Sequence, residues 1–122
     1  MYSVPTHKHV IHFSAAPAHA QKNERPYDAN LFRLAEFLGA IHYLRELCGA
    51  NEKQLWRKQM EALVDAEGTT AIRKIKLVNN FNKGYRGYRR TYRKCTPPAR
   101  AALKRFMQQG ATLASSISKF GQ

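Results

Sequence analysis

From Pro26 onward, apolar residues recur every three or four positions, the spacing of one face of an α-helix. Asp28 or Asn30 can cap the first helical segment, and Gly49 is a natural stop because glycine commonly follows the last helical residue. The apolar positions of this segment that step by three and four are Leu31, Leu34, Leu38 and Ile41.

A second helix is expected after Asn51 and Gln54, whose spacing resembles a capping box, and Gly68 ends it. Its apolar positions are Leu55, Trp56, Met60, Leu63 and Val64.

The third segment is the longest, starting at Thr69 or Thr70 and running to about Cys95. Thr96 followed by Pro97 then predicts a fourth helix, because a capping hydroxyl and a proline both suit a first turn. Interior positions of the third segment step by three and four, and the core residues expected among them are Phe81, Tyr85, Tyr88 and Tyr92. The seam of the fourth segment is Leu103, Phe106, Gly110, Leu113, Ile117 and Phe120.

No segment shows the period-two alternation of a half-buried strand, and the breaks between helical segments are short. The sequence therefore predicts an all-α fold, a four-helix antiparallel bundle formed by residues 26–122 as one domain. Residues 1–25 are expected to be a flexible tail or the remnant of a signal peptide.

Residues 81–95 mix aromatic and basic side chains, yet at about 100° per residue the two kinds fall on opposite faces. The aromatic face points to the core, so an RNA reader that stacks bases on exposed tyrosines is not expected. Gly84 and Gly87 lie on a flank and allow a close helix contact or a bend. The cations opposite are Lys83, Arg86, Arg90, Arg93 and Lys94.

The charge is divided unevenly along the chain. Residues 1–67 hold eight Lys or Arg and eight Asp or Glu, whereas residues 68–122 hold thirteen Lys or Arg and no acid. Such asymmetry is typical of a surface that binds a polyanion, which includes anionic lipid, an acidic envelope polymer and nucleic acid. The surface expected on the third helix is extended by Arg100, Lys104 and Arg105.

Residues 15–21 end in a small-x-small pattern at Ala18 and Ala20, which resembles a signal-peptide cleavage site after Ala20. The apolar stretch before it is short and interrupted by His12, so an incomplete leader and an ordinary tail both remain open. The neighbouring histidines lack acidic or thiol companions, and we expect neither a metal site nor a cofactor.

No catalytic constellation is apparent from the spacing of residues. His42 is a lone histidine in an apolar helix with Glu46 one turn on, which favours a hydrogen-bonded core histidine over a catalytic base. The chain has no phosphate-binding glycine loop, no His-Glu-x-x-His and no Cys-x-x-Cys motif. We therefore expect a binding or structural protein, not an enzyme.

Cys48 and Cys95 end the first and third helices, which places them at the same pole of an up-down-up-down bundle. A disulfide is thus topologically permitted if these two helices are adjacent, and it would stabilise the domain by about 4 kcal/mol. The alternative is a pair of buried free thiols in a cytosolic protein.

Six stretches of the sequence are specific enough to compare with known families: Pro26-Tyr27-Asp28, residues 34–45, Leu47-Cys48-Gly49-Ala50, Leu55-Trp56-Arg57, residues 81–88 and residues 92–97. Together they resemble a family of small secreted proteins from alphaproteobacteria whose function is uncharacterised. The resemblance extends from Pro26 nearly to the end of the chain, and it implies export by a signal peptide and a paired Cys48 and Cys95.

Together these observations predict a periplasmic helical protein that binds or supports an anionic component of the cell envelope through its basic helix face. Its partner would be anionic lipid, an envelope polymer or another envelope protein. The competing prediction is a cytosolic protein that uses the same cations on nucleic-acid phosphates, with affinity that falls steeply as salt rises.

Overall fold

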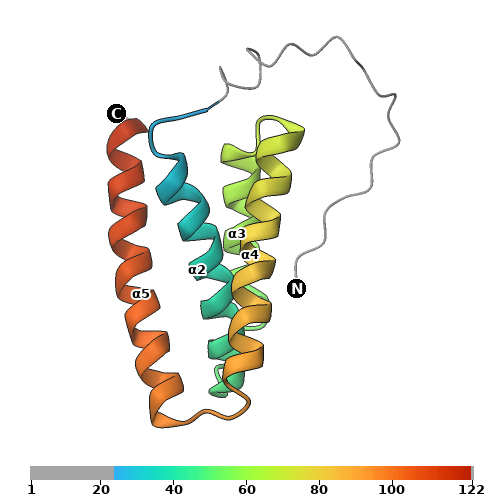
Figure 1. Ribbon diagram of the computed structural model, residues 1–122, viewed down its shortest axis with the longest axis vertical. Coiled ribbons are helices and arrows are strands. Elements are labelled where there is room, and N and C mark those ends of the chain that lie inside the picture. The colour runs from blue at the N-terminus through green and yellow to red at the C-terminus, as the bar shows by residue number, and fades with distance from the viewer. Residues whose placement is uncertain (1–23, 122) are drawn as a thin grey trace, which may run out of the picture.

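The computed structural model describes residues 24–121, so the expected cleavage site after Ala20 and the N-terminal histidines lie outside the described residues. The described part is all-α, as predicted (Figure 1). Its elements are α2 (Asp28–Leu47), α3 (Leu55–Glu67), α4 (Ala71–Thr91), α5 (Pro97–Ser118) and a short 3₁₀ turn, η1 (Lys119–Gly121).

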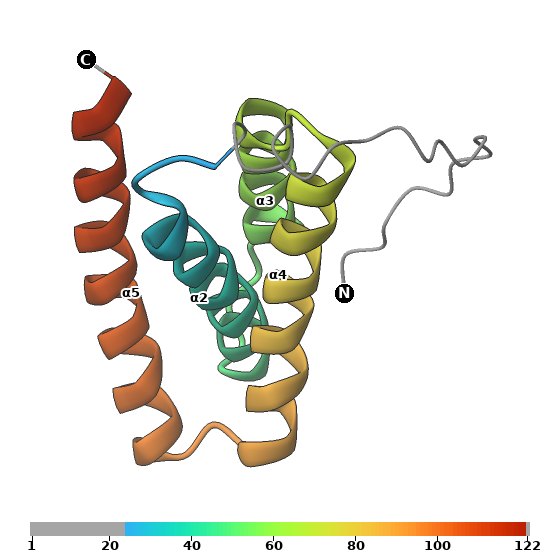
Figure 2. The ribbon, with the colours of Figure 1, turned by 45° about the horizontal axis from the view of Figure 1, so that its top comes forward.

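Helix α2 is the centre of the bundle. In both views it lies between α5 on one side and α3 and α4 on the other (Figures 1 and 2), and it packs against all three. Within residues 24–121, α5 makes no close backbone contact with α3 or α4. The helices alternate in direction, so α2 and α4 run the same way and α3 and α5 run opposite to them.

The closest helix contact joins α2 and α4 at two glycines. A Cβ atom built on Gly39 would lie 1.9 Å from the carbonyl oxygen of Phe81, and one built on Gly84 would lie 2.0 Å from that of Glu36. Each glycine therefore faces a backbone carbonyl of the other helix. A Cβ atom built on Gly87 would meet no atom within 4 Å, so the close contact involves Gly84 and not Gly87.

The core is divided between the two ends of α2. One cluster packs the first half of α2 against α3 and α4, around Leu31, Met60 and Phe81. The other packs the second half of α2 against α5, around Leu44 and Phe106.

Most helix ends follow the sequence pattern. Thr70 caps α4 by accepting a hydrogen bond from the Arg73 N–H, and Thr96 caps α5 by accepting one from the Ala99 N–H. Gly49 follows α2 with a φ of 82°, a left-handed conformation that glycine adopts without strain.

Two predicted N-terminal caps are wrong. Helix α2 starts after Tyr27, and Asp28 instead accepts a hydrogen bond from the Arg25 N–H. Helix α3 starts after Gln54 without a side-chain cap, so the expected capping box of Asn51 and Gln54 does not form.

Helix α4 ends at Thr91, four residues before the predicted end at Cys95. Tyr92 is extended, with φ −121° and ψ 117°. The extended segment that follows leads to Cys95, which is bonded to Cys48.

The predicted tyrosine seam of α4 needs a correction. Phe81 is fully buried, but Tyr85, Tyr88 and Tyr92 are half-buried. Because α5 makes no close backbone contact with α4, these tyrosines are covered by α2 and by side chains of α5 such as Phe106, which packs on Tyr88, and this cover is narrower than the seam. Similarly, at the far end of the α5 seam, Phe120 is 56% exposed.

The disulfide between Cys48 and Cys95 is formed, with the two Cα atoms 5.0 Å apart. It joins the carboxyl-terminal end of α2 to the segment that follows α4. The adjacency of these two helices, on which the predicted disulfide depended, comes from the paired glycines.

Candidate functional site

Ion pairs to the buried Arg73 hold Asp28 and Glu67 at the pole opposite the disulfide. The Arg73 guanidinium is 5% exposed and lies 2.7 Å from an Asp28 carboxylate oxygen and 3.4 Å from one of Glu67. Burial alone would raise the pKa of Asp28, but hydrogen bonds from Arg73 and from the Arg25 N–H outweigh burial and hold that pKa below its usual value. Arg73 is thus a structural cation.

The two halves of the bundle differ in charge. When each helix is divided at its middle, the half nearer the disulfide comprises residues 38–61 and 81–107, with thirteen Lys or Arg and three Glu. The remaining described residues hold six Lys or Arg and five Asp or Glu. Nearly all of the net positive charge of the described chain therefore lies in the disulfide half.

The outward face of α4 is the most continuous part of this basic surface. Lys83, Arg86 and Arg90 recur at three and four residues and are all exposed, on the side of α4 turned away from α2. Ile72 and Ile75 fall at the same helical phase toward the start of α4, and they are 55% and 44% exposed. We call these five residues the α4 outer face; it combines cations with exposed apolar side chains.

The other predicted site residues are also exposed, but they do not share one plane with the α4 outer face. Arg93 and Lys94 lie in the connection that follows α4. Arg100 and Lys104 line a depression on α5 together with Arg45. Arg105 lies at a different phase of α5, with its guanidinium 5.1 Å from the ring centre of Phe106.

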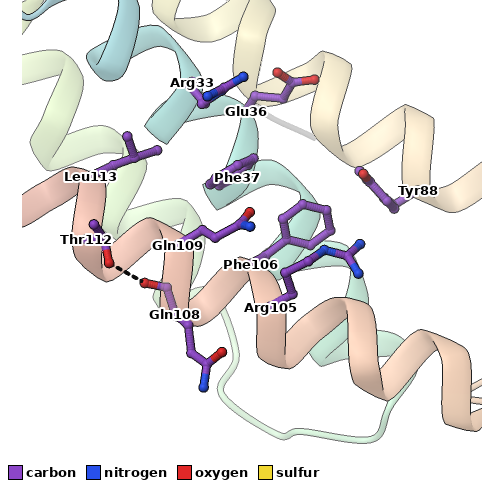
Figure 3. Close-up of a pocket in the computed structure, with 10 residues that line it drawn as sticks. All are labelled: Arg33, Glu36, Phe37, Tyr88, Arg105, Phe106, Gln108, Gln109, Thr112 and Leu113. Atoms are coloured by element: carbon purple, nitrogen blue, oxygen red, sulfur yellow. Dashed lines mark hydrogen bonds between the residues drawn. The ribbon is translucent and has the colours of Figure 1, made fainter.

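A groove of about 650 Å³ separates α4 from α5, with α2 as its floor (Figure 3). Phe37, Tyr88 and Phe106 give it an aromatic surface, and the rings of Tyr88 and Phe106 meet edge to face at 4.7 Å. Arg33 and Glu36 line the α2 side, and Arg105 lies beside Phe106 (Figure 3). Burial raises the pKa of Tyr88, while Arg105 opposes the shift, so this hydroxyl stays protonated at neutral pH.

A second groove, of about 560 Å³, separates α3 from α5 on the other side of α2. Leu34, Leu38 and Ile41 form its floor, while Trp56 and Met107 belong to its walls. We call it the α3–α5 groove. Sequence reasoning missed it, although small residues at helical spacing on both walls were a signal: Ala62, Ala66, Gly110, Ala111 and Ala114.

His42 occupies the position expected of a core histidine. Its side chain is 4% exposed, and Nε2 lies 3.2 Å from a carboxylate oxygen of Glu46. Burial lowers the pKa of His42, and Glu46 offsets part of that shift. Tyr85 packs against the imidazole at 5.6 Å between ring centres, so the ring is held in place and closed off from solvent.

Within the described residues, no group of three or more His, Cys, Asp or Glu is placed to hold a metal ion. None of the helices in the same part of the chain combines the length and hydropathy needed to cross a membrane.

Fold and surface define a disulfide-linked all-α bundle with a basic half and two grooves beside its central helix. Residues 26–120 match the family described as "Protein of unknown function (DUF2385)", and the chain belongs to that family. No curated protein and no solved structure matches the chain.

Proposed function

We propose that this protein binds anionic lipid surfaces in the periplasm through the α4 outer face. The observation that carries the proposal is that one side of α4 presents exposed cations and, about two turns nearer its start, two exposed isoleucines, in a half of the chain that contains no acid. Cations draw a protein to anionic headgroups, and apolar side chains on the same face insert between them. An acidic polymer or a nucleic acid would use the cations but offers no apolar layer for Ile72 and Ile75.

Two cations of this face, Lys83 and Arg90, are available for such a contact. Neither Lys83 nor Arg90 has a carboxylate within 4 Å in the part of the chain that the structure describes. The disulfide supports the proposed compartment, since disulfides persist in the oxidising periplasm and are rare in the cytosol. The proposed role is binding without catalysis.

The test compares two double variants of equal charge change on phosphatidylglycerol vesicles. Lys83→Glu with Arg90→Glu removes two cations from the α4 outer face and should weaken binding by at least thirtyfold, because each cation near an anionic surface contributes about 1 kcal/mol. Lys58→Glu with Lys119→Glu reverses two exposed lysines on α3 and η1 and should change binding by less than about threefold. Equal losses of vesicle affinity in the two double variants would contradict binding through the α4 outer face.

A third variant separates lipid from other polyanions. Ile72→Ser with Ile75→Ser should weaken vesicle binding while leaving the charge unchanged. Binding to single-stranded DNA or to an acidic polysaccharide, but not to phosphatidylglycerol vesicles, would reject the lipid proposal and favour a polyanion bound by charge alone.

Export is tested separately by the intact mass of the protein from its native host, measured before and after thiol alkylation. A chain that starts at Gln21 with no free thiol supports a periplasmic location. An uncleaved chain with both cysteines alkylated contradicts it.

A further inference from the structure

We propose that the α3–α5 groove binds the alkyl chain of a fatty acid, with the carboxylate held by Arg100 and Lys104. Arg100 and Lys104 belong to the same basic half as the α4 outer face but lie outside that face, so the carboxylate site goes beyond the proposed function. The position of the alkyl chain rests on the groove alone.

The groove is apolar along its length. Among the described residues that line it, the only polar side chain besides the indole of Trp56 is that of Gln59, and the floor is formed by leucine and isoleucine. It stays open because both walls carry small side chains, such as Ala62 on α3 and Ala114 on α5, which do not reach across. An apolar channel of this kind binds alkyl groups by removing them from water.

The size of the groove fits a single alkyl chain and not a protein partner. A volume of about 560 Å³ lies within the range of small-molecule pockets. From Met107 to Ala114 the α5 wall extends about 10 Å, at 1.5 Å per residue. A stable protein interface needs roughly 800 Å² on each partner, and a groove this short supplies only a fraction of that.

The groove leads directly to cations. Met107 and Ala111 line both the apolar groove and the basic depression formed with Arg45, Arg100 and Lys104. Methionine is flexible and adapts to its contacts, so Met107 is suited to the junction between the two. A bound amphiphile would thus have its chain on one side of Met107 and its anionic group on the other.

Arg100 and Lys104 are the cations left for the carboxylate. Arg45 is already paired, with its Nε 2.6 Å from a Glu52 oxygen that also accepts the Trp56 indole N–H at 3.0 Å. Arg100 and Lys104 are one helical turn apart on α5 and exposed, and neither has a carboxylate within 4 Å among the described residues. Two cations one turn apart suit a single anionic headgroup.

Trp56 is the only tryptophan in the chain and lines the groove, so its fluorescence reports occupancy directly. The oxidised protein is titrated with octanoate, decanoate and dodecanoate, each below its micelle concentration. Binding should be saturable, and affinity should rise roughly fourfold for each added methylene. Binding that does not saturate, or that is independent of chain length, would overturn the inference.

Matched variants test where the alkyl chain binds. Ala114→Leu fills the groove and should weaken dodecanoate binding at least tenfold, whereas Ala101→Leu, at an exposed α5 position that does not line the groove, should leave it unchanged. Circular dichroism confirms that both variants fold. Equal affinity for the two variants would show that the alkyl chain binds elsewhere.

The carboxylate contact is tested by Arg100→Gln with Lys104→Gln. This double should weaken dodecanoate binding about tenfold and leave binding of uncharged dodecanol unchanged. Equal losses for both ligands would contradict a carboxylate at these cations.

The two proposals fail in different ways. If dodecanoate does not saturate while the Lys83 and Arg90 double still loses vesicle binding, the fatty-acid site is wrong and the lipid-surface function stands. If dodecanoate binds as expected but the Lys83 and Arg90 double binds vesicles as well as the Lys58 and Lys119 control, the lipid-surface function is wrong and the fatty-acid site stands. Sedimentation that shows a dimer which Ala114→Leu disrupts and dodecanoate does not would assign the groove to a second copy of the chain.

Discussion

Gly84 and Gly87 lie three residues apart on one helix, yet alanine should have opposite effects at the two positions. At Gly87 an added methyl group meets nothing within 4 Å, so the substitution acts only on the helix itself. Alanine is more favourable than glycine in a helix interior by about 1 kcal/mol. Gly87→Ala should therefore raise the free energy of unfolding by up to about that amount.

At Gly84 the same methyl group would lie 2.0 Å from the carbonyl oxygen of Glu36 and 2.9 Å from its carbon atom. Side-chain Cβ atoms do not approach other atoms closer than 3.0 Å, so α2 and α4 would have to separate by about 1 Å. The contacting atoms are backbone and cannot rotate away. The disulfide near one end and the Arg73 ion pair at the other limit how far the helices can part.

Overpacking of this kind costs about 1–3 kcal/mol, and sometimes more, against a gain of about 1 kcal/mol from helix propensity. Because the atoms met at Gly84 are backbone, we take the upper end of this range, about 3 kcal/mol, and expect Gly84→Ala to lower the free energy of unfolding by about 2 kcal/mol, which separates it from Gly87→Ala by about 3 kcal/mol.

The measurement is urea unfolding of the oxidised protein, followed by far-UV circular dichroism. The midpoint should fall for Gly84→Ala and rise for Gly87→Ala, with the same dependence on urea in both, since a change of midpoint alone reports stability. If Gly84→Ala is as stable as Gly87→Ala, the close approach of α2 and α4 at this carbonyl is wrong.

Three further outcomes are expected. Replacing Cys48 and Cys95 by serine should lower the free energy of unfolding by about 4 kcal/mol, measured by urea unfolding against the oxidised parent, because the disulfide closes a loop of nearly fifty residues. Arg73→Met should cost about 3 kcal/mol in the same assay, since it leaves the Asp28 carboxylate without its buried partner, and Asp28→Asn made together with it should recover part of the loss. Burial lowers the pKa of His42, so the folded state favours the neutral imidazole. The contribution of His42 to the free energy of unfolding is therefore complete above the unfolded pKa of about 6.5, and it is lost as the pH falls toward the folded pKa. Stability curves of the parent and His42→Gln should therefore converge as pH falls from neutral, and a constant difference between them would contradict the lowered pKa.

The local pattern of the sequence determined a large part of this fold. Helix starts at Thr70 and Thr96 and the stop at Gly49 were predictable because caps and glycine stops depend on residues within one turn. The separation of cations from aromatic residues on α4 followed from the helical period alone. The placement of Cys48 and Cys95 at one pole followed from the alternating direction of successive helices.

Which side chains are buried was decided by tertiary structure. The period predicts that Tyr85, Tyr88 and Tyr92 share a face, but how much of that face is covered depends on which helices lie over it. The glycine at position 84 brings α2 within backbone contact of α4. Helix α5 makes no close backbone contact with α4 and reaches the tyrosine face with side chains such as Phe106, so the three tyrosines stay half-buried.

The grooves have the same origin. Helical spacing reports the apolar face of each helix separately, whereas a groove is the space between two helices that do not meet. That α3 and α5 flank α2 without close backbone contact to each other depends on the crossing of each helix over α2 and on the small side chains along the groove walls. The sequence by itself therefore determined the helices, their direction and the charge of the surface, and only the packing around α2 decided where that surface opens into a groove.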